Sequence, residues 1–218
     1  MQDMISMAGH AHATLPLDVL AGLTLLSIAP FVLVMCTSFV RIVVVLSLVR
    51  SAIGAAALPP NTVLTGLALI LTLVIMSPTL TAISNDAVKP YSQGKISQSQ
   101  FVDRAVVPLR NFMMRQARAA DVALFERVAH RALEPAQAAP TYVLIPAFVV
   151  GELRNGFAIG LALYLPFVAI DLAVASILMG LGMFMLSPPI VSLPAKLLLF
   201  VMVDGWALVC GGVASSFR

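Results

Sequence analysis

An uncharged apolar stretch interrupted by two adjacent prolines is the feature that most restricts how this chain folds. Residues 172–195 contain no charged side chain, and about 20 apolar residues are enough to cross a bilayer as a helix. Pro188 and Pro189 remove backbone donors and clash with the preceding turn, so they end or sharply bend a helix. The stretch therefore predicts a re-entrant or shallow helical hairpin over residues 171–206, with its bend at residues 182–189.

Isolated charges lie on both arms of this predicted hairpin, Asp171 on the first and Lys196 and Asp204 on the second. Counted from a bend near Ser187, Asp171 and Asp204 are expected to lie at one level, roughly 24 Å from the tip at 1.5 Å per residue. Two carboxylates at one level in an apolar setting are unfavourable unless water or a cation reaches them. We therefore expect the hairpin to have protein neighbours or a water-filled path beside it.

The composition predicts an all-α protein of hydrophobic helices, either integral to a membrane or embedded in an assembly. Of 218 residues, 60% are hydrophobic and 11% are charged, whereas about 25% of the residues in a soluble domain are charged. A net charge of +3 without a long basic run does not predict binding to nucleic acid, which needs a clustered basic surface. No phosphate-binding loop, zinc-ligand spacing or GxSxG motif occurs in the sequence, so no enzyme, cofactor or metal site is expected.

Changes in composition divide the chain into four segments. Residues 1–14 contain no Lys or Arg and are expected to form a flexible tail without a secretory signal. Residues 15–83 are expected to form hydrophobic helices, residues 84–141 a small charged helical subdomain outside the membrane, and residues 142–218 the C-terminal hydrophobic helices. Hydropathy alone suggests membrane spans near residues 17–36, 62–83, 156–181 and 183–206.

Local signals within the charged subdomain predict where its helices begin and end. Residues 85–94 have the composition of a loop, and Ser97 with Gln100 fits a capping box that opens a helix. Pro108 is expected to break that helix, because a proline in a helix interior removes a hydrogen bond and clashes with the preceding turn.

Three lone charges in the apolar segments require partners or water. Arg41 either marks the membrane edge by extending its guanidinium to the surface, or lies in a long kinked helix packed within an assembly. Glu152 and Arg154 point to different sides of a helix, so each is expected to need a partner on another element.

Five long motifs of the sequence resemble, in the same order, those of the FliP/SctR family of export-gate proteins in bacterial type III secretion. The second and third of the motifs listed below favour the flagellar branch of the family over the injectisome branch. The motifs are MCTSFVRIVVVLSLVRSAIG, LPPNTVLTGLALILTLVIMSP, FMMRQARAADVALF, VLIPAFVVGELRNGF and DLAVASILMGLGMFMLSPPIVSLPAKLLLFVMVDGW.

The resemblance implies a pentamer of this chain that joins FliQ and FliR, works with FlhA and FlhB in the inner membrane of the flagellar basal body, and passes unfolded flagellar subunits. It implies that Met183, Phe184 and Met185 form the methionine-rich constriction of the family, with Phe184 in place of one methionine. A methionine ring can close around varied side chains because the thioether is flexible and polarisable. The resemblance also implies a periplasmic position for residues 84–141, although their Lys and Arg content favours the cytoplasm by the positive-inside rule.

The matching motifs around Glu152 and Lys196 lead us to predict an ion pair between these residues of neighbouring subunits; the alternative is a pair of water-solvated charges facing a pore. Three other functions stay open on the sequence. The chain could be an injectisome homologue, a small secondary transporter or ion channel using Asp171, Asp204 and Glu152, or a membrane scaffold.

Overall fold

The computed structural model describes residues 34–54, 58–130 and 139–217, together with Leu23, Ser27, Pro30 and Phe31. The chain divides into two compact units, Met1–Val34 and Met35–Arg218, and the following concerns the second unit. All secondary structure in the described residues is helical, as the composition predicted. The predicted tail, residues 1–14, lies outside the described residues.

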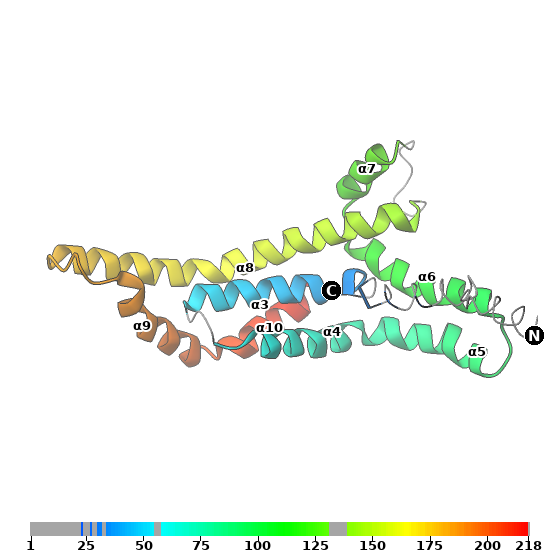
Figure 1. Ribbon diagram of the computed structural model, residues 1–218, viewed down its shortest axis with the longest axis horizontal. Coiled ribbons are helices and arrows are strands. Elements are labelled where there is room, and N and C mark those ends of the chain that lie inside the picture. The colour runs from blue at the N-terminus through cyan, green and yellow to red at the C-terminus, as the bar shows by residue number, and fades with distance from the viewer. Residues whose placement is uncertain are drawn as a thin grey trace, which may run out of the picture. The chain divides into compact units, whose positions relative to one another are not determined.

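Helices α3 (Phe39–Ile53) and α8 (Thr141–Gly180) pack lengthwise against each other (Figure 1). Glycines one turn apart on α8 allow the close approach. A Cβ on Gly160 would lie 2.3 Å from Cδ1 of Leu48, and a Cβ on Gly156 would lie 3.1 Å from Cγ1 of Val44. Small residues at this spacing are typical of tightly packed membrane helices.

Helix α4 (Asn61–Ile83) continues through a π-helical turn, η1 (Ser84–Val88), into the short α5 (Lys89–Ser92). The predicted loop at residues 85–94 is therefore wrong over most of its length. Pro90 lies in the first turn of α5, where its missing N–H costs no helical hydrogen bond, so this proline does not interrupt the helix. The predicted span at residues 62–83 lies within Asn61–Ser92, which is long and apolar enough to cross a membrane.

Helix α6 (Gln98–Gln116) begins at the predicted capping box. The Ser97 hydroxyl accepts from the backbone N–H of Gln100, and the Gln100 side chain accepts from the backbone N–H of Ser97. Pro108 lies inside this helix and does not end it, so the predicted break is wrong. Pro108 is buried, and the next turn buries Phe112 and Met113; this packing offsets the lost hydrogen bond.

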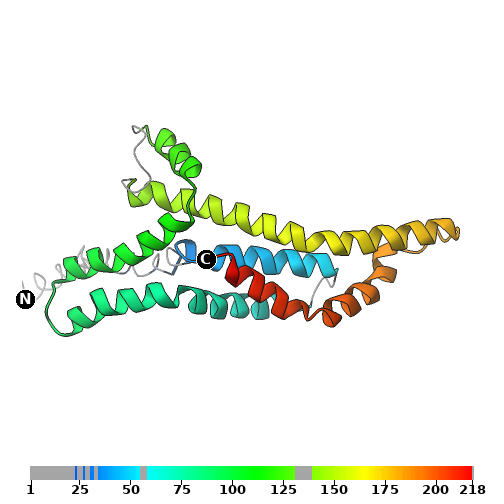
Figure 2. The ribbon, with the colours of Figure 1, turned by 180° about the vertical axis from the view of Figure 1, so that it is seen from behind.

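The short helix α7 (Ala119–Val128) packs on α8, and α6 lies beside α4 and α8. The first buried apolar cluster joins α3, α4, α8, α9 (Pro188–Met202) and α10 (Gly205–Ser215). The second lies between α6, α7 and the N-terminal part of α8, and includes Phe112, Val122 and Phe148. The reverse view shows α10 running alongside α3 and α4 (Figure 2).

The last predicted span, residues 183–206, is not one straight helix. Helices α9 and α10 are bent by 64° at their junction, where Asp204 adopts a left-handed conformation with φ 49°. The bend brings Gly205 against Phe200, whose ring would lie 2.3 Å from a Cβ at position 205. Within the described residues, Asn61–Ser92 and Thr141–Gly180 are each long and apolar enough to span a membrane, and the bent pair α9–α10 could form a third, broken span.

Candidate functional site

The turn between α8 and α9 carries the predicted constriction residues. Gly182 adopts φ 73°; its N–H donates to the Met179 carbonyl, and the Met183 N–H donates to the Leu178 carbonyl at 2.9 Å. This pair of bonds is the Schellman motif that ends many helices, and it needs a residue that tolerates positive φ, which glycine does. Pro188 and Pro189 are the first two residues of α9, directly after the turn.

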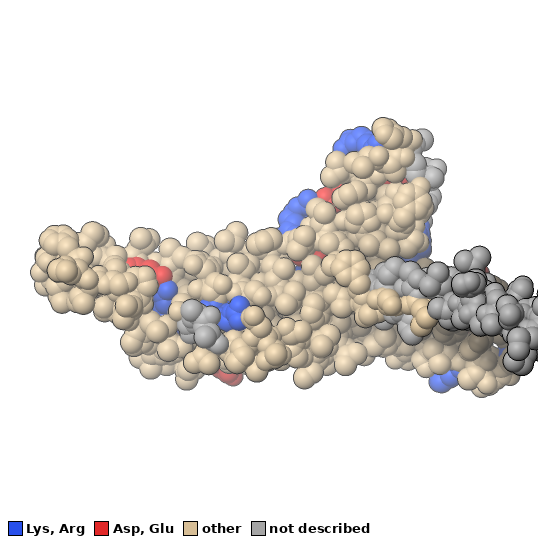
Figure 3. Space-filling model, in the orientation of Figure 1, with Lys and Arg blue, Asp and Glu red and all other residues tan. Residues whose placement is uncertain are grey.

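The side chains of this turn are apolar and unpacked in the single chain. Phe184 is 79% exposed and Met185 is 101% exposed, while Met183 is 43% exposed. The tip shows no charged side chain on the face drawn in Figure 3. A soluble monomer rarely leaves a contiguous apolar patch uncovered, so this surface is suited to contact with other apolar groups.

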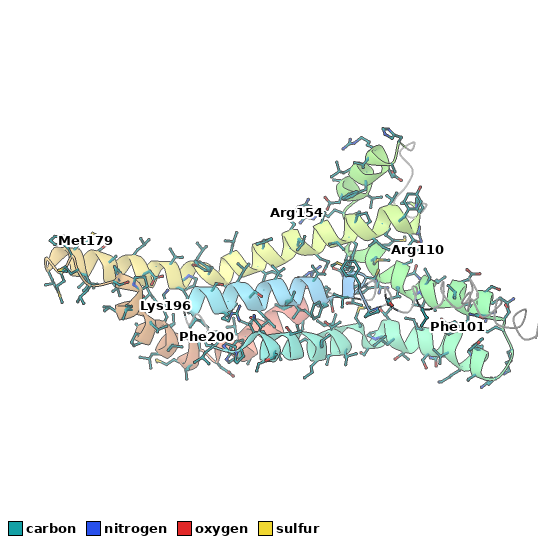
Figure 4. The ribbon with its side chains drawn as sticks, viewed as in Figure 1. Phe101, Arg110, Arg154, Met179, Lys196 and Phe200 are labelled. Carbon is teal, nitrogen blue, oxygen red and sulfur yellow. The ribbon has the colours of Figure 1, made fainter. Side chains whose placement is uncertain are left out.

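Below the tip, Lys196 and Asp171 link the two arms of the hairpin. The Lys196 Nζ donates to Oδ2 of Asp171 at 2.5 Å and to the carbonyl of Ala52 at 3.2 Å. The Ser192 hydroxyl donates to Oδ1 of the same carboxylate. Lys196 is only 5% exposed and projects from α9 toward α8 (Figure 4), and its contact with Ala52 ties the hairpin to the last turn of α3.

Arg41 and Glu152 form a second buried pair, between α3 and α8. The guanidinium donates to both carboxylate oxygens, through Nε at 3.0 Å and through Nη2. The remaining N–H groups donate to the Ser216 carbonyl at 2.9 Å, the Ser216 hydroxyl at 3.0 Å and Oε1 of Gln116 at 3.0 Å. All five N–H groups of Arg41 are therefore used, and its guanidinium also lies 3.7 Å from the centre of the Phe217 ring.

Arg41 is 1% exposed and Glu152 is 0% exposed. The interpretation that Arg41 extends to a membrane edge is therefore wrong, because the guanidinium is enclosed by protein groups. The groups that enclose Arg41 belong to its own chain, so the alternative of a long kinked helix packed within an assembly stays a prediction.

Arg154, two residues after Glu152, pairs in the other direction as its spacing predicted. It donates to both carboxylate oxygens of Asp121 on α7, at 2.7 and 2.8 Å. This bidentate hydrogen bonding holds the pKa of the Asp121 carboxyl below its usual value. The pair attaches α7 to α8.

Glu152 and Lys196 do not pair with each other within one chain. Glu152 has Arg41 as its partner and Lys196 has Asp171, so both charges are already balanced. The predicted pair between neighbouring subunits stays a prediction, and it would require both residues to exchange partners. Asp204, the third predicted intramembrane charge, is exposed and makes no side-chain hydrogen bond with another described residue.

The partners of these charges were not visible in the sequence. Gln116, Ser216 and Phe217 carry no motif that connects them to Arg41, and the only available signal was the need of a buried guanidinium for several acceptors. Among the described residues, no three His, Cys, Asp or Glu side chains gather as a metal site would require.

The chain resembles known proteins over nearly its whole length. A model of the FliP family matches residues 22–213. The Flagellar biosynthetic protein FliP of Pectobacterium carotovorum subsp. carotovorum is 49% identical over 210 residues, covering 96% of this chain and 81% of the relative. Proteins of the same name are 46% identical over 202 residues in Caulobacter vibrioides, covering 91% and 76%, and 44% identical over 196 residues in Bacillus subtilis, covering 89% of each.

Proposed function

The chain belongs to the FliP family, and on that premise we propose that it is a pore-forming subunit of the flagellar protein export gate. A role in flagellar export follows from the family, and the helices that could span a membrane agree with a position in the inner membrane at the flagellar base. The finer proposal is that unfolded flagellar subunits pass through a central constriction to which each copy contributes Met183, Phe184 and Met185.

The observation that carries this proposal is the apolar tip of the α8–α9 hairpin. Its side chains are exposed in the single chain, and none of them is charged. Tips of several copies that converge on one axis would cover each other's apolar surface. Such a ring resists ion leak because a narrow apolar passage excludes water, and flexible thioethers can adapt to varied passing side chains.

The Lys196–Asp171 bridge supports the same proposal. It connects both arms of the hairpin to the end of α3. These contacts fix the position of α9 against α8 and α3, and therefore that of the tip. We propose that about five copies assemble with FliQ and FliR and work with FlhA and FlhB, and that residues 84–141 face the periplasm. The pairing of Asp171 and Glu152 with basic residues favours this gate over a transporter that uses free carboxylates as an ion path.

Polar substitution at the tip tests the proposal. We expect Met185→Ser combined with Phe184→Ser to raise ion conductance severalfold when the assembled particle is placed in planar bilayers. The matched control is Leu172→Ser, which changes a side chain of similar exposure (64%) on α8, away from the turn. If the tip variant conducts no more than the control while the particle assembles normally, the constriction does not lie at the tip.

Crosslinking tests the convergence of the tips. In a background with Cys36→Ala and Cys210→Ala, which removes both free cysteines, Met185→Cys is expected to give disulfide-linked copies of the chain on oxidation, whereas Leu172→Cys is not. Absence of linked copies at position 185 in a particle of several copies would refute the shared central passage.

A further inference from the structure

A cleft of about 230 Å³ lies between α6 and the wall formed by the C-terminal part of α4 with η1. Pro78, Ala82 and Asp86 line one wall at four-residue spacing, and Val107, Asn111 and Arg115 line the other at the same spacing. Residues four apart share one face of a helix, so the two walls face each other over two helical turns.

The polar groups of this cleft have no partners in the described part of the chain. Asp86 and Arg115 form no ion pair there, and the side chain of Asn111 makes no hydrogen bond. Asp86, Asn111 and Arg115 are all exposed, so a ligand that offers both donors and acceptors can reach them.

The cleft lies at the end of an uncharged run. No charged residue occurs between Arg50 and Asp86, and Asn61–Ser92 could span a membrane. The hydrocarbon core takes up about 20 helical residues. With Asn61 near one edge of the core, the cleft falls at the opposite edge, at the depth of the lipid headgroups.

An apolar track leads into the cleft. Ile70 and Val74 are exposed and precede Pro78 at four-residue spacing on the same face of α4. Helix α6 returns antiparallel to α4 after a short connection (Figures 1 and 2). Arg115, in the last turn of α6, therefore lies toward the apolar track, and Asp86 lies toward the outer end of the cleft.

We propose that this cleft binds the headgroup of a phospholipid that carries a primary ammonium group, that is, a phosphatidylethanolamine. The phosphate meets Arg115, the ammonium group meets Asp86, and an acyl chain follows Ile70 and Val74. The order of groups along the cleft matches the order in the lipid, in which the phosphate lies between the acyl chains and the ammonium group. A guanidinium binds a phosphate through charge-assisted hydrogen bonds, and an ammonium group with N–H donors pairs with a carboxylate.

The test is lipid selectivity of the full chain in vesicles that contain equal amounts of phosphatidylethanolamine and phosphatidylcholine. We expect native mass spectrometry of protein released from these vesicles to show phosphatidylethanolamine enriched at least threefold. Phosphatidylcholine has a quaternary ammonium group without N–H donors, so Asp86→Asn is expected to abolish the enrichment. Arg115→Gln is expected to lower retention of both lipids. The control Asp103→Asn changes another exposed carboxylate, on α6, and is expected to keep the enrichment.

Three results would overturn the proposal: equal retention of the two lipids by the unchanged chain, retained enrichment in Asp86→Asn with unchanged helical circular dichroism, or release of the lipid by an equal concentration of soluble glycerophosphoethanolamine. The proposal depends on the position of the chain in a bilayer and not on the export gate. An Asp86→Asn variant that exports normally but loses lipid selectivity therefore separates the two.

Discussion

The pair of Arg41 and Glu152 gives the sharpest energetic prediction, because neither residue has access to solvent. Replacing Glu152 with Gln keeps an acceptor oxygen for one N–H of Arg41 but leaves the buried guanidinium without a counter-charge. Removing one partner of a buried ion pair costs about 3–5 kcal/mol, of which a lost hydrogen bond to a charged group accounts for about 1.5–3 kcal/mol. We therefore expect Glu152→Gln to lower the free energy of unfolding by about 3–5 kcal/mol.

The assay can use the only tryptophan of the chain. Trp206 lies on α10 and packs edge-on against Phe200, with ring centres 5.1 Å apart. Its fluorescence therefore reports the separation of α9 from α10 as the protein in mild-detergent micelles is titrated with a denaturing detergent. A loss of less than about 1 kcal/mol, the size expected for an exposed ion pair, would refute the buried pair.

The double substitution Arg41→Met with Glu152→Met identifies the cause of the loss. Removing both charges together is often close to neutral, so the double variant should be more stable than Arg41→Met or Glu152→Met alone, even though Ser216 and Gln116 lose a donor. If instead Lys196→Met rescues Glu152→Met in the assembled particle and Arg41→Met does not, Glu152 pairs with Lys196 of a neighbouring copy, as the family motifs led us to predict.

Two further predictions concern the contacts that hold α8. Gly160→Ala should destabilise the chain by about 1–3 kcal/mol, because its Cβ would lie 2.3 Å from Cδ1 of Leu48. Leu48→Ala should relieve only part of the clash, because Cβ of residue 48 would still lie 2.9 Å away. Gly180→Ala, which meets nothing within 4 Å, should have little effect in the same unfolding assay. The pKa of Asp121 is lower in the folded chain because of Arg154, so the stability that this carboxylate contributes is present above its unfolded pKa of about 3.9 and is lost as the pH falls through the lower folded value. The protection factors of the α7 amides, which are corrected for the intrinsic exchange rate at each pH, should therefore fall on acidification below about pH 4. The protection factors in Asp121→Asn should be less sensitive over that range, and equal sensitivity would refute this role.

Several elements of the fold could be predicted from local sequence because local interactions decide them. The uncharged apolar runs predicted helices that could cross a membrane, and Ser97 and Gln100 predicted the start of α6, since a capping box forms between residues three apart. The predicted break at Pro108 failed because its outcome depends on packing. A proline inside a helix loses one hydrogen bond, and tertiary packing can offset that loss. Pro108 is buried together with the core residues that follow it, so the helix continues.

The composition and the ordered motifs by themselves determined the all-helical class, the family and the apolar character of the hairpin turn. Only the tertiary structure decided which charges pair. Arg41 and Glu152 are 111 residues apart, and they meet because the glycines of α8 allow α3 to approach closely along one face. Spacing along a helix determines the direction in which a charge points, but its partner depends on which other helix occupies that side, and this is decided by long-range packing.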